Sequence, residues 1–215
     1  MFKFAQRLSL LFFALLLPGC LSAHYFPVGS FTEFENERDA TFFAKRYSEN
    51  LSKLREPSLW KTADNTQGAE QYRLLFSTGA SPVHSIRLVV VPDSSATVII
   101  KKLNTGVRQT GNKYLDLSKR ISASENEVNA FQQVLTELDF WNAQPIDPFG
   151  TQEIICLHPT FFLFEAVKSG GYKAHQETTC SYTEITTELA PLFMELAGFG
   201  PDTSDWTFWD YFNHY

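Results

Sequence analysis

Three stretches of the chain show the spacing of an amphipathic helix. Over Glu33–Leu54, apolar residues recur every three or four positions and charged residues fill the opposite side. Ser124 and Glu127 form a capping box, in which the serine caps the first turn and the glutamate bonds back to it. Apolar residues follow at helical spacing as far as Leu138. Thr183–Ala197 is the third predicted helix.

Proline and glycine limit the third helix. Pro191 either kinks it or occupies its first turn after an irregular start. Gly198 is suited to the left-handed conformation that follows many helices. The third helix is therefore expected to end at Gly198, with an irregularity near Pro191.

Runs rich in Val and Ile predict an antiparallel sheet. Ser85–Val91 and Ala96–Leu103 flank a Pro-Asp-Ser-Ser turn and are typical of a hairpin. Thr160–Val167 and Tyr172–Thr179 flank Ser-Gly-Gly and predict a second one. We expect an α+β fold in which a sheet built from two hairpins packs against two or three helices. Shorter strands are predicted over Tyr72–Phe76 and Tyr114–Ile121, and a loop over Lys61–Gly68.

Two cysteines lie at the open end of the second hairpin. With a turn centred on Gly170, opposed residues have numbers that add up to about 340, which brings Cys156 and Cys180 near each other. A disulfide needs Cα atoms about 5.5 Å apart, and a small bulge would bring the two cysteines opposite. We predict a Cys156–Cys180 disulfide, with two free thiols as the alternative.

The N-terminus has the layout of a secretory signal. Lys3 and Arg7 precede an apolar run over Leu8–Leu17, which stops at a Pro-Gly pair. A membrane span needs roughly 20 apolar residues, so this run is too short. We predict a signal over residues 1–19 and a single domain over residues 20–215.

Cys20 decides where the exported protein resides. Leu-Pro-Gly before Cys20 resembles a lipobox, in which the cysteine is acylated and becomes the new N-terminus. Leu21 follows where an Asp would retain a lipoprotein at the inner membrane, so we expect an outer-membrane lipoprotein facing the periplasm. Pro18 departs from the usual lipobox. The alternative is cleavage after Ala23 and a soluble periplasmic or secreted protein.

Composition narrows the partner. Without its signal the chain has 16 basic and 24 acidic residues, a net charge of −8. This charge argues against nucleic acid and against adhesion to anionic lipid, so contact with the membrane is expected only through a lipid anchor. It suits a cationic protein partner, although most acidic residues only solvate a surface.

Further sequence features lie between Tyr72 and Gly198. A Phe-Trp pair ends a helix, a Pro loop and a cysteine follow, and an aromatic strand with a Glu precedes a Gly-Tyr turn exit and a second cysteine. This order resembles that of a group of small exported proteins and lipoproteins of bacteria. The chain departs from the group at His158-Pro159, where Asp-Gly is usual. The resemblance implies one α+β domain with a disulfide-tied hairpin, and it implies no activity. Its matching residues are Phe140, Trp141, Pro145, Cys156, Phe162, Glu165, Gly171, Tyr172 and Cys180.

Candidate chemistry is sparse. No hydrolase elbow, zinc motif or phosphate loop occurs, and we expect no metal or cofactor. His158, Glu165 and His175 lie on or beside the second hairpin, where the predicted register places Glu165 opposite His175. A His beside a carboxylate has a raised pKa and suits general acid–base work. The alternative is an ordinary cross-strand pair.

The C-terminal tail is rich in aromatic and acidic residues. Such aromatic clusters are typical of protein-binding hot spots, or they fold back to cover a core edge. The candidate contact residues are Trp206, Phe208, Trp209, Tyr211 and Phe212.

Three functions are consistent with the sequence. We expect a non-catalytic envelope protein that binds another envelope or secreted protein, as an immunity-type inhibitor does. The alternatives are a periplasmic enzyme that uses Glu165 and His175, and a structural envelope lipoprotein.

Overall fold

The computed structural model describes most of the chain between residues 25 and 199. The described residues are 25–32, 34, 37–65, 67–78, 82–92, 94–105, 113–147 and 159–199. Several predictions fall on other parts of the chain. The predicted signal, Cys20, Cys156, His158 and the aromatic tail all lie outside the described residues.

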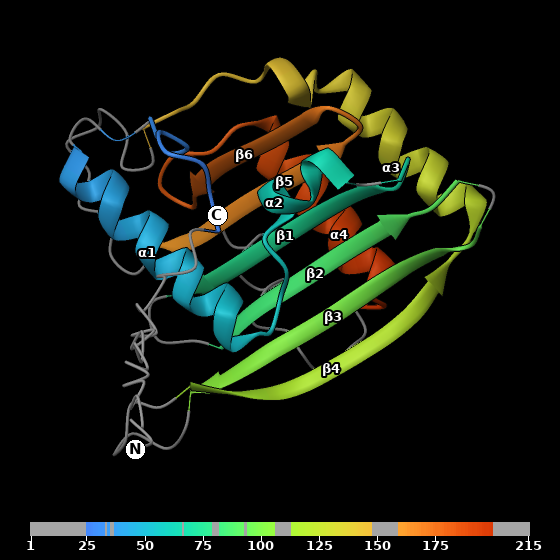
Figure 1. Cartoon of the computed structure of the whole chain (residues 1–215), viewed down its shortest axis with the longest axis horizontal. Coiled ribbons are helices and arrows are strands. Elements are labelled where there is room, and N and C mark those ends of the chain that lie inside the picture. The colour runs from blue at the N-terminus through green and yellow to red at the C-terminus, as the bar shows by residue number, and fades with distance from the viewer. Residues whose placement is uncertain are drawn as a thin grey trace, which may run out of the picture.

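A six-stranded antiparallel sheet, in the order β4-β3-β2-β1-β5-β6, forms the centre of the domain (Figure 1). Each pair of consecutive strands from β1 to β4 is antiparallel, and β1 also pairs with β5 of the second hairpin. The strands are β1 (Glu70–Thr78), β2 (Val83–Val90), β3 (Ala96–Thr105), β4 (Lys113–Ala123), β5 (Thr160–Lys168) and β6 (Gly171–Thr178). The predicted α+β fold is confirmed, and β1 joins the two predicted hairpins into one sheet.

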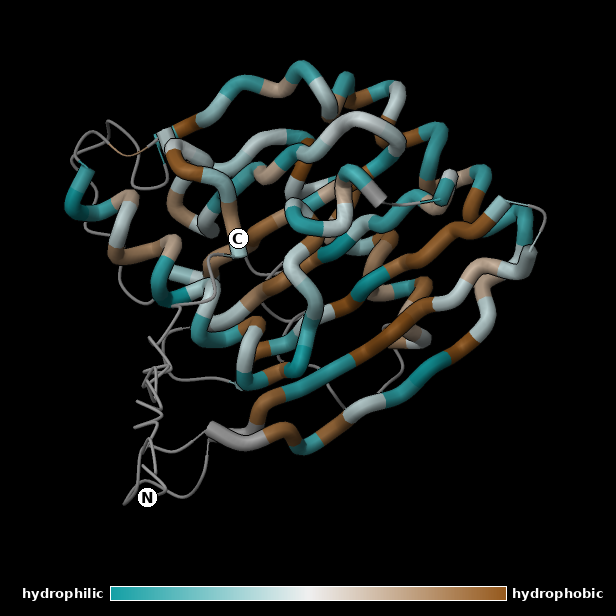
Figure 2. Tube along the Cα trace, in the orientation of Figure 1, coloured by the Kyte–Doolittle hydropathy of each residue, from teal (hydrophilic) through white to brown (hydrophobic). Residues whose placement is uncertain are grey.

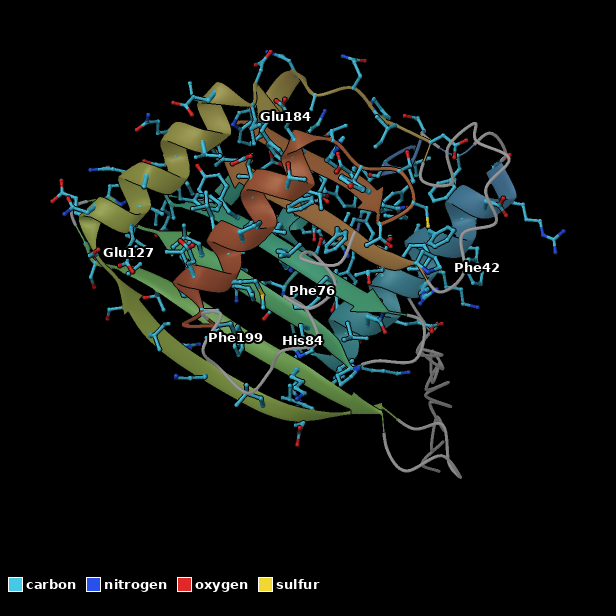
Figure 3. The ribbon with its side chains drawn as sticks, turned by 180° about the vertical axis from the view of Figure 1, so that it is seen from behind. Phe42, Phe76, His84, Glu127, Glu184 and Phe199 are labelled. Atoms are coloured by element: carbon cyan, nitrogen blue, oxygen red, sulfur yellow. The ribbon has the colours of Figure 1, made fainter. Side chains whose placement is uncertain are left out.

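Helices cover both faces of this sheet. The face seen in Figure 1, called the front, carries α1 (Glu37–Lys53) and α2 (Leu59–Thr62). The back carries α3 (Glu125–Glu137) and α4 (Ala190–Leu196), and Figure 3 shows α4 crossing it between Glu184 and Phe199. Three short helical segments complete the fold: η1 (Ala63–Asn65), η2 (Phe140–Asn142) and the π-helical turn η3 (Ile185–Leu189).

The helix ends follow local sequence signals. Ser124 and Glu127 form the predicted capping box at the start of α3. Pro191 lies in the first turn of α4 after a π-helical lead-in, which confirms the second of the two predicted alternatives. Gly198 has a φ of 74° and follows α4. The predicted loop at Lys61 is wrong at its start, because Ser58 caps α2 by accepting a hydrogen bond from the backbone N–H of Lys61.

Alternating side chains build one apolar core on each face. Figure 2 shows apolar segments along the central strands and a mixture of polar and apolar segments along β4. Because successive strand residues point to opposite faces, Tyr72 and Leu74 enter the back core while Leu75 enters the front core. The back core extends under α3 and α4 through Phe131 and Phe193. The front core lies beneath α1, whose predicted apolar face is buried: Phe43, Tyr47, Leu51 and Leu54.

Candidate functional site: a buried ion network and an uncovered basic face

Arg73 is a fully buried arginine on the front of β1. Its cross-strand neighbour on β5 is Glu165, whose Oε2 accepts a hydrogen bond from Arg73 Nε at 2.7 Å and a second from Arg73 Nη2. Arg73 Nη1 donates to the carbonyl of Pro57 at 2.8 Å. A buried charge is tolerated only when it is paired and hydrogen-bonded, and these contacts meet that condition.

Glu56 connects this pair to the next two strands. Its carboxylate is 3% exposed and lies 3.5 Å from Arg73 Nη1. Its Oε2 accepts a hydrogen bond from Arg87 Nε at 2.7 Å, and its Oε1 lies 2.7 Å from Lys101 Nζ. Arg87 comes from β2 and Lys101 from β3, so four strands and the segment after α1 meet in one ionic network.

Arg55 turns the chain so that Glu56 enters the sheet. After α1 the backbone N–H of Arg55 donates to Ser52 and that of Glu56 donates to Leu51, both at 2.9 Å. This is a Schellman motif, which requires a left-handed residue that is usually Gly. Arg55 adopts that conformation with a φ of 54°, and its carbonyl accepts a hydrogen bond from Lys101 Nζ at 2.7 Å.

The surroundings of each group fix its ionisation. Burial raises the pKa of Glu56, but the charges of Arg87 and Arg73 and the hydrogen bond from Lys101 outweigh it and leave that pKa below the ordinary value of 4.5. Burial, and then the charge of Glu165, raise the pKa of Tyr172 well above 10. Tyr172 is therefore a neutral donor, and its hydroxyl donates to Glu165 Oε1 at 2.8 Å.

The network has more positive than negative charge. Among the described residues, the ion pairs of Arg73, Arg87 and Lys101 involve two carboxylates, those of Glu56 and Glu165. Arg87 and Lys101 are each 11% exposed through their side chains, so the network reaches the surface at these two residues. The surplus cation is therefore at the solvent side of the network.

Beside Arg87 and Lys101, at the end of the sheet away from α1, no helix of the described residues lies over the front of β3 and β4 (Figure 1). Arg120 on β4 is exposed and lies opposite Ile99, on the same face as Lys101. Burial lowers the pKa of Arg87 and the neighbouring charge of Arg120 contributes to that lowering. We call this surface the basic face; it comprises Arg87, Lys101 and Arg120, with the exposed Ser118 and Ser122 beside them.

The predicted pairing of Glu165 with His175 is wrong. In the observed register Glu165 lies opposite Ala174, and His175 lies opposite Phe164. The register differs by one residue from the predicted one, and a one-residue shift moves every side chain to the other face. Glu165 therefore enters the front network and His175 the back core, so the sheet separates the two groups.

His175 has a different partner on the back. Its Nε2 lies 2.8 Å from Oε1 of Glu177, two residues along the same strand. Glu177 Oε2 also accepts a hydrogen bond from the backbone N–H of Thr183 at 2.9 Å. Burial raises the pKa of Glu177, but the hydrogen bonds from His175 and Thr183 outweigh it and lower that pKa. Both side chains are buried. Through its hydrogen bond with Thr183, the Glu177 carboxylate holds the segment that leads into η3 against β6.

Sequence reasoning missed the ionic network. The sequence pattern predicts the wrong partner for Glu165, and Glu56, Arg73 and Arg87 have the sequence context of ordinary solvated charges. One signal was present: Arg73 interrupts the apolar strand around it, on the face that also holds Leu75. A charge within a buried strand requires a partner, but its identity depends on the strand order.

The predicted disulfide is described at one end only. Cys180 follows β6, is half-buried and is disulfide-bonded. Cys156 and Cys20 lie outside the described residues, so the Cys156–Cys180 pairing stays a prediction. The same holds for the lipidation of Cys20, for His158 and for the tail residues Trp206–Phe212.

The described part of the chain offers little for other chemistry. Among its residues no group of three or more His, Cys, Asp and Glu side chains is placed to hold a metal ion. No helix in this part is both long enough and apolar enough to cross a membrane.

Comparison with known proteins gives no relative: no protein family, no curated protein and no solved structure matches the chain.

Proposed function

We propose that this protein is a non-catalytic envelope protein that binds another envelope or secreted protein through its basic face. The observation that supports this is the uneven cover of the sheet. Among the described residues, α3 and α4 lie across the back, whereas Ser118, Arg120 and Ser122 are exposed on the front of β4. A rigid strand surface of this kind positions side chains well for recognition.

An immunity-type inhibitor that blocks a toxin in the periplasm is one specific form of this function. The enzymatic alternative loses its supporting argument, because Glu165 and His175 lie on opposite faces of the sheet. A structural lipoprotein without a discrete ligand is the remaining alternative, and it gives no reason for an uncovered basic face.

Site-specific photo-cross-linking in cells tests the proposal. A photo-reactive residue at Ser122 probes the front of β4, and one at Lys119 probes the back of the same strand. We expect a discrete cross-linked protein from position 122 and none from position 119. Ser122→Trp, which adds bulk without charge, should abolish cross-linking from position 118. Equal cross-linking from both faces, or none from the front, would contradict the proposal.

The proposed location has its own test. We propose that Cys20 is acylated and anchors the domain to the outer membrane, since each buried CH₂ of an acyl chain contributes about 0.8 kcal/mol. The intact mass of protein purified from bacterial membranes should match an acylated chain that begins at Cys20. A mass that matches an unmodified chain beginning at His24 would instead indicate a soluble protein.

The predicted disulfide is tested in the same experiment. A mass gain of two protons on reduction, with peptide mapping, would establish the Cys156–Cys180 bridge.

A further inference from the structure

We infer that the basic face binds a short acidic segment of the partner protein, whose carboxylates contact Arg87, Lys101 and Arg120. This inference rests on the proposed function and adds the chemistry of the ligand to it. Three properties of the face support it: unused hydrogen-bond donors, unneutralised charge and the shape of the surface.

The donors of the network are only partly used. A guanidinium group has five N–H donors. Arg87 uses Nε for Glu56 and one N–H of Nη1 for Gln71 Oε1 at 2.8 Å. Lys101 Nζ has one N–H beyond its contacts with Glu56 and the Arg55 carbonyl. Both side chains are 11% exposed, so an incoming carboxylate has donors to bind.

Arg120 adds a complete guanidinium group. It is exposed on the front of β4, and no ion pair or hydrogen bond of its side chain is present among the residues described. With Arg120, four cations face two carboxylates across this part of the sheet. Positive charge beside a desolvated network is unfavourable, and an anion from a partner would offset it.

The surroundings favour protein carboxylates over other anions. The basic face is the surface of three neighbouring strands, β2, β3 and β4, which suits an extended segment. The whole chain has a net charge of −6, so a polyanion such as nucleic acid or an anionic membrane is repelled at long range. A short acidic segment senses mainly the local cations, because charges beyond about 10 Å are screened. Paired Arg and carboxylate groups also form strong bidentate hydrogen bonds.

The segment is expected to lie across the face and not to extend the sheet. β4 is an edge strand, but a bulge at Asp116 interrupts its register between the pairs at Lys102 and Leu103. Bulges and charged residues such as Lys119 are the devices that prevent strand addition at a sheet edge. The front side chains of β4 are therefore the contact surface.

A labelled peptide tests the inference. The probe is a ten-residue peptide in which Glu alternates with Thr, and its control carries Gln in place of Glu. Fluorescence anisotropy with the full mature chain should show binding of the Glu peptide, at least about tenfold weaker binding of the Gln peptide and weakening with added salt. Arg120→Glu should weaken the Glu peptide about tenfold.

Lys119→Glu is the matched control, since it makes the same charge change on the same strand but on the back. It should leave peptide affinity unchanged within about twofold, because only its long-range charge acts on the front. Equal loss in the two variants would overturn the inference, as would equal binding of the two peptides. Circular dichroism should show both variants folded, because both positions are exposed.

Two further measurements distinguish an acidic peptide from a lipid surface and from a partner without acidic residues. Vesicles rich in phosphatidylglycerol that bind in an Arg120-dependent way, without peptide binding, would replace the inference by a lipid surface. Cross-linking in cells tests the proposed function independently of the peptide chemistry. If Ser122→Trp removes cross-linking while Arg120→Glu does not, the basic face binds a partner without acidic recognition, so the inference fails and the proposed function stands.

Discussion

The two faces of the sheet are stabilised by different physical means. The back is an apolar core beneath α3 and α4, in which Tyr72 contacts Phe131 edge to face and Phe131 contacts Phe193 in the same way. The front is apolar beneath α1 but ionic beside it, where Arg73 is as deeply buried as any leucine. Apart from the buried His175–Glu177 pair on the back, a change of volume should therefore weaken the back, whereas a change of charge should weaken the front network.

The largest effect is expected on the front from Arg73→Leu. It leaves Glu165 buried without its main partner, which costs about 3–5 kcal/mol in unfolding free energy. Arg73→Leu with Glu165→Leu removes both charges and should recover part of that loss. Urea unfolding followed by circular dichroism measures both. If the single variant loses less than about 1 kcal/mol, the distinction between the faces is wrong.

On the back, Leu88→Ala should cost about 2–5 kcal/mol, because Leu88 is fully buried and its removal leaves a cavity. This cost should not depend on salt or on pH between 7 and 4, because no charge is involved. Unfolding at low and high salt measures this. A strong dependence of the Leu88→Ala cost on either condition would show that the faces are coupled.

Acid should weaken the front through Glu56. Its pKa is lowered in the folded protein, so it contributes stability above the ordinary value of 4.5, and that contribution is lost as pH falls through the lowered pKa. The difference in unfolding free energy between wild type and Glu56→Gln should therefore be largest above pH 5 and narrow on acidification. On the back, the difference in unfolding free energy between wild type and Glu177→Gln should also narrow on acidification, because the pKa of Glu177 is lowered as well. If the difference in unfolding free energy between wild type and Glu56→Gln stays constant down to pH 3, Glu56 does not have a lowered pKa in the folded protein.

A smaller loss is expected at the start of α3, at the edge of the back layer. Ser124→Ala removes the two capping-box hydrogen bonds made by the Ser124 hydroxyl, which donates to the Glu127 carboxylate and accepts from the Glu127 backbone N–H, and should cost about 1 kcal/mol. Ser122→Ala, two residues earlier on the exposed front of β4, is the control and should change stability by less than about 0.5 kcal/mol. Equal effects at the two positions would show that the cap is not the cause.

The smallest effect has the opposite sign. Arg55→Gly should stabilise the front by about 0.5–1 kcal/mol, because glycine adopts the left-handed conformation of Arg55 without strain. Lys45→Gly, in the middle of α1 and exposed, should destabilise by about 1 kcal/mol. Thermal unfolding distinguishes the two signs. A loss of stability in Arg55→Gly would mean that the arginine side chain itself supports the turn.

The sequence predicts the local elements well. The capping box at Ser124 and the apolar spacing around Phe43 depend on neighbours within a few positions, so they can be read without knowing the fold. The helix α2 was missed because it has only four residues and its signal is the single cap at Ser58.

The partners of the charged residues could not be predicted from local sequence. The turn sequence placed β5 against β6 to within one residue, but in a strand one residue decides the face. For that reason the turn predicts a pair between His175 and Glu165, whereas in the structure His175 contacts Glu177 and Glu165 contacts Arg73. The spacing of a turn fixes approximate pairing, whereas packing of both faces fixes the register.

The sequence by itself determined the three amphipathic helices, the two hairpins and the α+β class, because apolar periodicity, caps and turn residues act over short distances. Only the tertiary structure decided which charges are buried. Glu56, Arg73 and Glu165 are far apart in the chain, and they meet because β1 pairs with β5 while the turn at Arg55 directs Glu56 onto the sheet. A buried charge is stable only with its partner, and the strand order supplies that partner.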